Sequence, residues 1–230
     1  MYSGNSKIEG ITFVLAAAGV GKRMGLGYPK QFLEYEGKPL FIKPLEVAQA
    51  SELIKQVIVV TGKESIEFVK NQCIKYGIKK VTKVVEGGSE RQYSIEKALA
   101  HCSNDSIIAV HDGVRPFLKE KYFREALKIL SDNRNVNGVI VGVRVKDTIK
   151  KVNDNGDVVD TPKRSELIAA HTPQIFRGEI LKSAYKKAHH EKYLGTDDSS
   201  LVERYSGGVR FLLGDYDNIK ITTIEDLKYL

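Results

Sequence analysis

Residues 11–25 read ITFVLAAAGVGKRMG, an apolar run rich in β-branched residues that passes directly into a glycine-rich loop. Such a run predicts a buried strand, and open parallel sheets bind ligands at the loops that follow the carboxyl ends of their strands. The small loop residues allow backbone N–H groups to approach a polyphosphate, although a simple tight turn would use the same residues. The glycine spacing fits no Rossmann fingerprint, and the loop has no Gly-Lys-Ser/Thr step of a Walker motif.

Similar apolar runs recur along the chain and alternate with helical patterns. After Ile11–Leu15, the segments that read as strands are Gln56–Val60, Lys80–Val85, Ser106–Val110, Gly138–Val143 and Val209–Leu213. Apolar residues at i, i+3 and i+4 predict helices between them, at Leu40–Ser51, Lys63–Tyr76, Gln92–His101 and Lys119–Asn133. This alternation predicts an α/β fold with a Rossmann-like, mostly parallel sheet that is buried on both faces by flanking helices.

The alternation breaks after the strand at Gly138–Val143. Arg144–Lys151 alternates apolar and polar residues, Asp154-Asn155-Gly156 supplies turn chemistry, and an extended run resumes at Val158. We therefore expect a projecting β-hairpin arm at residues 144–164, inserted in a single domain that spans residues 1–230. The arm has too few large apolar residues to be stable alone, so it should pack on the parent domain or embrace a second subunit.

The composition indicates which class of partner and which cell compartment to expect. Over 230 residues, 36 Lys and Arg against 29 Asp and Glu give a net charge of +7, which favours a polyanionic partner. Phosphorylated metabolites are polyanions that suit this positive charge. Because the sequence has no block of Lys and Arg residues and no alternation of aromatic and basic residues, we expect no nucleic-acid partner. There is no membrane-length apolar run and no signal-like start, and Cys73 and Cys102 lack a metal or CxxC spacing. We expect a cytoplasmic protein that does not span a membrane.

Two further loops follow predicted strands. Residues 87–94 read GGSERQYS and open a helix, which by itself indicates a helix N-cap. Residues 111–117 read HDGVRPF, and an acidic side chain in a site crowded with phosphates requires a cation, so Asp112 is a candidate Mg²⁺ ligand. The alternative is that Asp112 and Arg115 form an ion pair that shapes the turn. We expect His111 to be packed and hydrogen-bonded rather than to act as a base.

These blocks together resemble the sugar-phosphate nucleotidyltransferases. The loop Ala-Ala-Gly-x-Gly-x-Arg-Met-Gly is followed by Pro29-Lys30-Gln31-Phe32-Leu33, which is similar to the cytidylyltransferase branch of that family. The similarity runs from about Phe13 to Leu227 with the motif blocks in the expected order. It implies a GT-A-like nucleotidyltransferase fold and an enzyme that joins CTP to a sugar-alcohol phosphate with release of pyrophosphate. The resemblance also implies Mg²⁺ or another divalent cation as cofactor.

The resemblance assigns roles to individual residues. Arg23 and Lys30 match residues that offset charge at the α-phosphate, and Lys220 matches a residue between the nucleotide and the acceptor. The positions implied to be catalytic are Arg23, Lys30, Arg164 and Lys220. Those implied to bind the nucleotide are Ala16, Ala17, Ala18, Gly19, Gly21, Arg23, Lys30, Gly88, Arg91, Ser94, Asp112 and Lys220.

The acceptor is implied to bind at Thr148, Arg164, Thr172, Thr196 and Asp197. By local sequence alone, Thr196 or Asp197 would simply cap a helix. In the family, the arm residues that match Thr148 and Arg164 come from the neighbouring subunit, so the resemblance also implies a homodimer formed through the arm.

Three functions remain open on the sequence. Lys146–Lys150 and Thr196–Glu203 look like their counterparts in cytidylyltransferases that convert 2-C-methyl-D-erythritol 4-phosphate to 4-diphosphocytidyl-2-C-methyl-D-erythritol, in the non-mevalonate route to isoprenoids. Val114 leans instead toward ribitol-5-phosphate cytidylyltransferases, which serve teichoic-acid-type polymers. A non-catalytic nucleotide-binding regulatory module is the third reading, and it is disfavoured because every charged position that the chemistry requires is filled.

Overall fold

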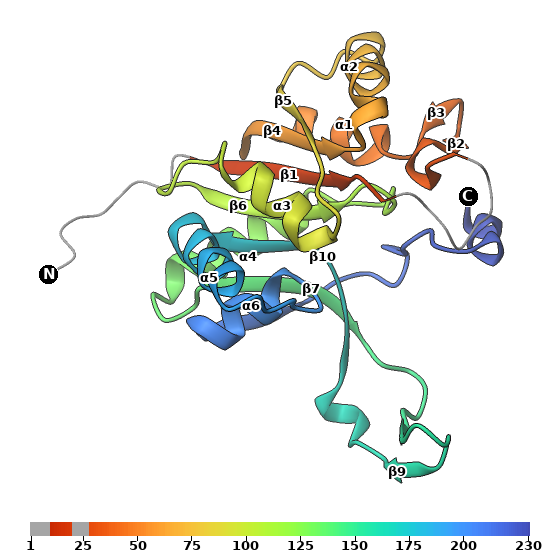
Figure 1. Cartoon of the computed structure of the whole chain (residues 1–230), viewed down its shortest axis with the longest axis vertical. Helices are drawn as coiled ribbons and strands as arrows, with labels where there is room; N and C mark the ends of the chain where they lie inside the picture. The colour runs from red at the N-terminus through yellow and green to blue at the C-terminus, as the bar shows by residue number, and fades with distance from the viewer. Residues whose placement is uncertain (1–9, 20–27) are drawn as a thin grey trace, which may run out of the picture.

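The computed structural model describes residues 10–19 and 28–230, and seven strands of this part of the chain form one sheet (Figure 1). The strands are β1 (Ile11–Ala17), β4 (Ile54–Thr61), β5 (Val81–Glu86), β6 (Ile107–Asp112), β7 (Gly138–Arg144), β10 (Ile168–Arg177) and β11 (Val209–Leu213). Across the sheet they lie in the order β11-β7-β10-β6-β1-β4-β5. The mostly parallel α/β sheet predicted from the sequence is confirmed, and each predicted strand is present with small shifts at its ends.

Helices cover both faces of the sheet, as the apolar patterning predicts. One face packs on α1 (Ile42–Ala50), α2 (Ile66–Lys75) and α4 (Lys121–Asp132), and the other on α3 (Arg91–Leu99), α5 (Gly178–His190) and α6 (Asp198–Tyr205). Alternate residues of β1 serve the two layers, because Phe13 and Leu15 join the first core cluster whereas Val14 joins the second. No helix in the described part of the chain is long and apolar enough to cross a membrane.

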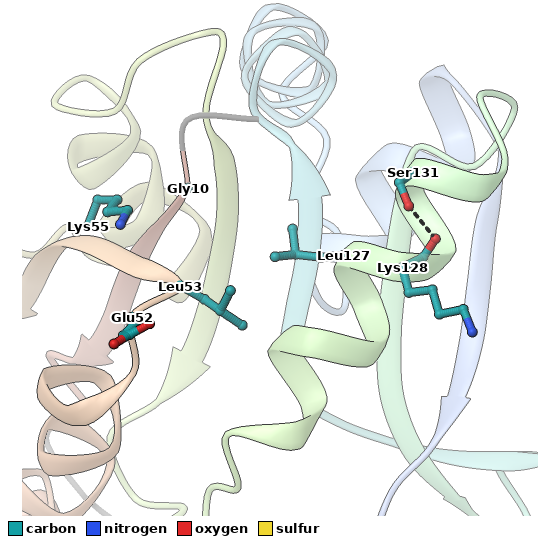
Figure 2. A pocket seen from close by; sticks show the side chains of 7 residues that line it. All are labelled: Gly10, Glu52, Leu53, Lys55, Leu127, Lys128 and Ser131. Atoms are coloured by element: carbon teal, nitrogen blue, oxygen red, sulfur yellow. Dashed lines mark hydrogen bonds between the residues drawn. The ribbon is translucent and has the colours of Figure 1, made fainter. Parts of the chain in front are cut away.

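Strand register brings the carboxyl ends of the central strands together. β1 is parallel to both β4 and β6, and Ala16 near the end of β1 lies opposite Asp112 at the end of β6. The loops after these strands therefore open at the same edge of the sheet. At the opposite edge, a hollow lies beside the start of β1 and the end of α4, and its lining includes Gly10, Lys55 and Lys128 but no predicted site residue (Figure 2).

Strand β10 is not among the strands that the sequence analysis predicts. It lies between β6 and β7 and is antiparallel to both. The proline lacks an N–H and argues against a central strand. The structure accommodates Pro173 because the β10–β7 ladder is irregular between Ala170 and Gln174, and the pairing with β6 begins only at Gln174. The helix α5 that follows was likewise not predicted.

Residues 144–164 leave the sheet at the end of β7 and return to β10 as a projecting arm (Figure 1). Its hairpin is short, with β8 at Lys151–Val152 and β9 at Val158–Asp160, so the predicted extended run at Arg144–Lys151 is mostly irregular. Every residue from 146 to 161 is exposed. Apart from contacts at its base, the arm does not pack on the parent domain, and its association with a second subunit stays a prediction.

Small elements complete the described chain. They are η2 (Lys30–Phe32), the β2–β3 hairpin (Glu34–Tyr35 and Lys38–Pro39), η3 (Lys63–Ser65), η4 (Arg164–Glu166) and η5 (Ile224–Tyr229).

Candidate active site

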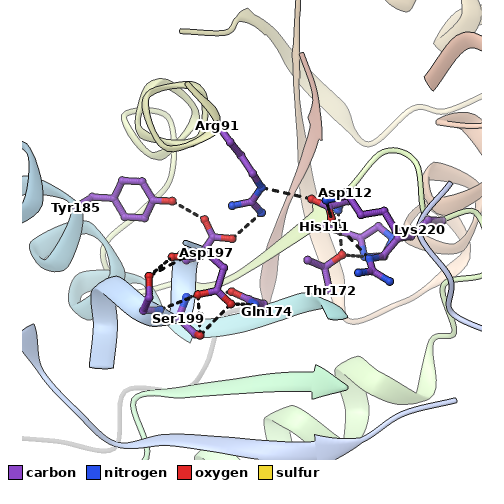
Figure 3. A network of polar contacts seen from close by, with 12 residues as sticks. Arg91, His111, Asp112, Thr172, Gln174, Tyr185, Asp197, Ser199 and Lys220 are labelled. Atoms are coloured by element: carbon purple, nitrogen blue, oxygen red, sulfur yellow. Dashed lines mark hydrogen bonds and ion pairs between the residues drawn. The ribbon is translucent and has the colours of Figure 1, made fainter. Parts of the chain in front are cut away.

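Asp112, the last residue of β6, lies at the centre of a cluster of cations (Figure 3). Its carboxylate is 2.9 Å from Lys220 Nζ, 3.4 Å from Arg91 Nε and 3.6 Å from Arg115 Nε, while only 8% of its side chain is exposed. Burial alone would raise the pKa of Asp112, but the charges of Arg91, Lys220 and Arg115 outweigh it and hold that pKa well below its ordinary value. The cluster thus contains a permanent buried anion among three fixed positive charges.

A hydrogen-bonded chain behind Asp112 explains the role of His111. The backbone N–H of Asp112 donates to Thr172 Oγ1 at 3.1 Å, and that hydroxyl lies 3.0 Å from His111 Nδ1. His111 Nε2 lies 3.0 Å from the carbonyl oxygen of Arg115, so we assign the proton to Nε2. Burial lowers the pKa of His111 to about 4, which agrees with a neutral ring. His111 is packed and hydrogen-bonded, as the sequence analysis expected.

Lys220 reaches the cluster from the far end of the chain. The backbone N–H of Ile221 donates to the carbonyl of Val114 at 2.9 Å, and Arg115 Nη1 donates to the carbonyl of Asn218 at 2.7 Å. The buried Asn218 donates from Nδ2 to the carbonyl of Thr172 at 2.8 Å. Arg115 therefore has the structural role that the sequence suggests, and it holds the segment that carries Lys220 against β6 and β10.

The glycine-rich loop after β1 is anchored by Gln31. Its amide donates to the carbonyl of Ala17 at 2.6 Å and is buried, so the short η2 turn that contains Lys30 is fixed at the carboxyl end of β1. Gly19 is exposed at the end of the described stretch. The predicted nucleotide-binding residues Gly21 and Arg23 lie outside the described residues.

The glycine-rich loop at residues 87–94 lies directly against the loop after β1. A Cβ atom on Gly87 would lie 2.6 Å from the Cβ of Ala18, so only glycine permits this approach. The backbone N–H of Gly88 donates to Ser94 Oγ at 2.9 Å, which closes the loop over the start of α3. The predicted positions Ala18, Gly88 and Ser94 are thus brought together beside the end of β1.

Arg91 is held by residues that the sequence analysis missed. One Nη atom donates to Asp198 Oδ2 at 2.7 Å, and the hydroxyl of Tyr185 donates to the other oxygen of Asp198 (Figure 3). The Asp198 side chain is fully buried. Arg91 therefore bridges two carboxylates, Asp112 on β6 and Asp198 on α6. The adjacent acids Asp197-Asp198 are visible in the sequence, but acidic residues at the start of a helix are already explained by their interaction with the helix dipole.

Asp197 caps α6, as one reading of the sequence predicted. Its carboxylate accepts the backbone N–H of Ser200 at 2.9 Å and the side-chain amide of Gln174 at 2.7 Å. Thr196 is exposed and precedes the cap. The acceptor-binding roles of Thr196 and Asp197 stay predictions.

The predicted acceptor residues of the arm are separate from this cluster. Thr148 and Arg164 are both exposed, and Arg164 Nη1 donates to the carbonyl of Lys146 at 2.9 Å. Within the described residues of one chain, no hydrogen bond or ion pair joins either side chain to Asp112 or Lys220.

The described part of the chain has no group of three or more His, Cys, Asp or Glu side chains that could hold a metal ion. Asp112 offers a single carboxylate, and its lowered pKa keeps it anionic. Mg²⁺ is commonly held by one or two carboxylates together with substrate phosphates, so this donor set fits Mg²⁺ that is bound jointly with a nucleotide.

Comparison with known proteins gives a consistent result over the whole chain. Residues 11–229 match the family model described as 2-C-methyl-D-erythritol 4-phosphate cytidylyltransferase. Proteins of that name from Fusobacterium nucleatum and Alkaliphilus metalliredigens are 51% and 44% identical to this chain. These alignments cover 100% and 94% of this chain, and 100% and 90% of the relatives.

Solved structures agree with the sequence relatives. The 4-diphosphocytidyl-2C-methyl-D-erythritol synthase of Anaerococcus prevotii matches with a TM-score of 0.81 at 30% identity, covering 96% of this chain and 95% of that one. The 2-C-methyl-D-erythritol 4-phosphate cytidylyltransferase of Francisella tularensis matches with a TM-score of 0.80 at 26% identity, covering 96% and 97%.

Proposed function

Because the chain belongs to the 2-C-methyl-D-erythritol 4-phosphate cytidylyltransferase family, we propose that it transfers a cytidylyl group from CTP to 2-C-methyl-D-erythritol 4-phosphate. The products are 4-diphosphocytidyl-2-C-methyl-D-erythritol and pyrophosphate, within the non-mevalonate route to isoprenoid precursors. The observation that carries the proposal is the family match together with Lys220, Arg91 and Asp112 at the carboxyl edge of the sheet, beside both glycine-rich loops.

In the proposed reaction, an oxygen of the acceptor phosphate attacks the α-phosphorus of CTP in line, and the bond to pyrophosphate breaks. This oxygen is already anionic near neutral pH, so the step needs no strong general base. That agrees with His111, whose two ring nitrogens are both hydrogen-bonded to the protein. Lys220, anchored to Asp112, supplies a fixed positive charge toward the phosphates, and Lys30 with Arg23 supplies charge from the first loop.

The proposed cofactor is Mg²⁺ or a similar divalent cation, held by Asp112 together with the phosphates of CTP. When bound, it would neutralise charge on the triphosphate. The test is calorimetric titration of CTP with and without Mg²⁺ into the wild type and an Asp112→Asn variant. Mg²⁺ should tighten CTP binding to the wild type by tenfold or more and have little effect on the variant, and an equal Mg²⁺ effect in both proteins would reject Asp112 as the ligand.

The central experiment is a pyrophosphate-release assay with CTP and two acceptors offered separately. Methylerythritol phosphate should be turned over with a much higher kcat/KM than ribitol 5-phosphate. A preference for ribitol 5-phosphate would support the teichoic-acid-type alternative. Tight CTP binding without release with either acceptor would favour the non-catalytic module.

We also propose a homodimer formed through the arm. Four apolar arm side chains are exposed by 41–59%, namely Ile149, Val152, Val158 and Val159, and this supports a partner surface. Sedimentation equilibrium should give twice the chain mass of 25.7 kDa for the wild type. A Val158→Asp/Val159→Asp variant should sediment as a monomer with an unchanged circular dichroism spectrum. A monomeric wild type at micromolar concentration would contradict the dimer.

A cytoplasmic location is the remaining proposal. Cys73 and Cys102 are free and buried, and burial raises their pKa values to about 11 and 12. Two free thiols suit a reducing compartment. Fractionation of cells that express the tagged chain should place it with cytoplasmic markers.

A further inference from the structure

Tyr216 lies where two functional segments of the chain meet. It follows β11 in the segment that ends at Lys220, and β11 pairs with β7, from whose end the arm departs (Figure 1). The backbone N–H of Gly214 donates to the carbonyl of Gly142 at 2.7 Å, so this segment runs along the end of β7. Tyr216 is thereby placed beside the first residues of the arm.

Two contacts join Tyr216 to the base of the arm. Its hydroxyl donates to the carbonyl of Arg144 at 2.8 Å, and Lys146 Nζ lies 3.8 Å from the centre of its ring. A cation this close to an aromatic face is attracted by the ring quadrupole. Tyr216 thus holds both the last residue of β7 and the second residue of the departing chain.

The contacts of Lys146 and Arg144 extend to the returning strand of the arm. The carbonyl of Lys146 accepts a hydrogen bond from Arg164, and Arg144 Nη1 donates to the carbonyl of Ser165 at 2.8 Å. A hollow at the arm base is lined by Arg144, Val145, Lys163, Arg164 and Ser165. The position of Arg164 therefore depends on a backbone that Tyr216 holds.

The other end of the segment around Tyr216 is fixed independently. Asp215 accepts from Tyr122 and pairs with Lys121 at the start of α4, and it also pairs with Lys119 just before that helix. Asn218, two residues beyond Tyr216, is buried and bonded to β10. Tyr216 projects from a rigid support, whereas the arm beyond Lys146 is exposed and has no comparable support in the described chain.

We propose that Tyr216 is a positioning residue that sets the angle at which the arm leaves the sheet and so places Arg164 and Thr148 for the acceptor. The expected effect on kinetics rests on the proposed function, whereas the contacts between Tyr216 and the arm do not depend on it. Because Arg164 is bonded to Lys146 and Thr148 lies two residues beyond Lys146, a rotation of the arm about its base displaces both side chains. Tyr216 does not touch the cluster around Asp112, so CTP binding should not depend on it.

The experiment compares Tyr216→Phe, which loses only the hydroxyl contact, with Tyr216→Ala, which also loses the ring beneath Lys146. Tyr205→Phe is the matched control, because Tyr205 is partly exposed, donates to Glu191 at 2.7 Å and has a lysine over its ring. Tyr216 is 46% exposed, so neither substitution leaves a buried cavity.

The kinetic readout is the KM of each substrate. Tyr216→Phe should raise the KM for methylerythritol phosphate about fivefold, which corresponds to the net contribution of one hydrogen bond. Tyr216→Ala should raise this KM more than tenfold. The KM for CTP and kcat should stay within twofold, and Tyr205→Phe should match the wild type. An unchanged acceptor KM in Tyr216→Ala, or equal rises for both substrates, would overturn the positioning role.

Amide hydrogen exchange tests the tether without reference to any reaction. Peptides that cover residues 144–152 and 163–170 should exchange faster in Tyr216→Ala than in the wild type, while peptides from α2 should not change. Unchanged exchange at the arm base would overturn the proposal. If the wild type turned over neither acceptor, the proposed function would fail, and the exchange result would still decide whether Tyr216 holds the arm.

Discussion

The cluster around Asp112 and the arm at residues 144–164 contain the same kinds of charged side chain in opposite surroundings. In the cluster, an aspartate that is 8% exposed contacts three cations, and two of them, Arg91 and Arg115, donate further hydrogen bonds within the fold. At the return of the arm, Lys163 pairs with Glu166, which lies just beyond the arm, and these side chains are 74% and 70% exposed. A buried charge requires partners within the fold, so its geometry is fixed before any ligand arrives. Water competes for the partners of an exposed charge, so the fold holds its geometry less firmly.

The largest expected effect is on turnover and concerns the cluster. Lys220→Met should lower kcat by about 10²–10³-fold, equivalent to about 2.7–4 kcal/mol, because it removes a fixed charge at the reacting phosphates. The fold should survive, since the Lys220 side chain is 38% exposed. Lys128→Met, at the opposite edge of the sheet, is the matched control. Steady-state kinetics with saturating CTP measures the change, and near-normal kcat would remove Lys220 from the mechanism.

The second effect is on stability and concerns the buried support of the cluster. Asp198→Ala should lower the free energy of unfolding by about 2–3 kcal/mol, because it leaves the buried hydroxyl of Tyr185 without its partner and the guanidinium of Arg91 with Asp112 alone. The loss falls below that of a fully buried pair because one third of the Arg91 side chain is exposed. Urea unfolding at pH 7 measures the change. A loss below about 0.5 kcal/mol would mean that Asp198 contributes no more to stability than an exposed ion pair does.

The third effect is a pH dependence that the cluster should show and the arm should not. His111 and His171 both have their pKa lowered to about 4 by burial, with Arg115 adding to the effect at His171, and the arm contains no histidine. Between pH 6.5 and about 4, the unfolded chain binds protons that the folded chain does not. The free energy of unfolding should therefore fall as the pH falls, by at most about 1.4 kcal/mol per pH unit for each histidine.

Urea unfolding at pH 7, 6 and 5 tests this dependence. His111→Asn should flatten the curve, while His101→Asn, which replaces an exposed histidine, should leave its slope as it is in the wild type. A wild type of constant stability from pH 7 to pH 5 would show that neither buried ring stays neutral.

The smallest expected effect belongs to the arm. Glu166→Gln removes an exposed ion pair with Lys163, and the free energy of unfolding should change by less than about 0.5 kcal/mol. Acceptor KM should also stay within twofold, because Glu166 is not among the predicted acceptor residues. A loss above 1 kcal/mol would mean that arm charges are held as firmly as those around Asp112.

The sequence predicted the sheet and its flanking helices because each buried strand carries its own apolar run. It failed at β10, where Pro173 and the polar residues His171, Thr172 and Gln174 hide a central strand. Two of these residues face hydrogen-bond partners rather than water: Thr172 bonds Asp112 and His111, and Gln174 bonds Asp197 and Ser199. A local pattern cannot distinguish a polar residue in a loop from one that is satisfied inside the fold.

The sequence by itself determined which loops lie at the carboxyl edge, since strand order along the chain and parallel pairing place Lys30, Gly88 and Asp112 there. Only the tertiary structure decided how the charges are paired. Lys220 meets Asp112, and Arg91 meets both Asp112 and Asp198, across separations of 21 to 108 residues in the chain. Such contacts depend on packing between distant elements, and no periodicity or local motif encodes them. The arm illustrates the same limit, because its departure from the sheet is held by Tyr216, which lies 72 positions beyond Arg144 in the sequence.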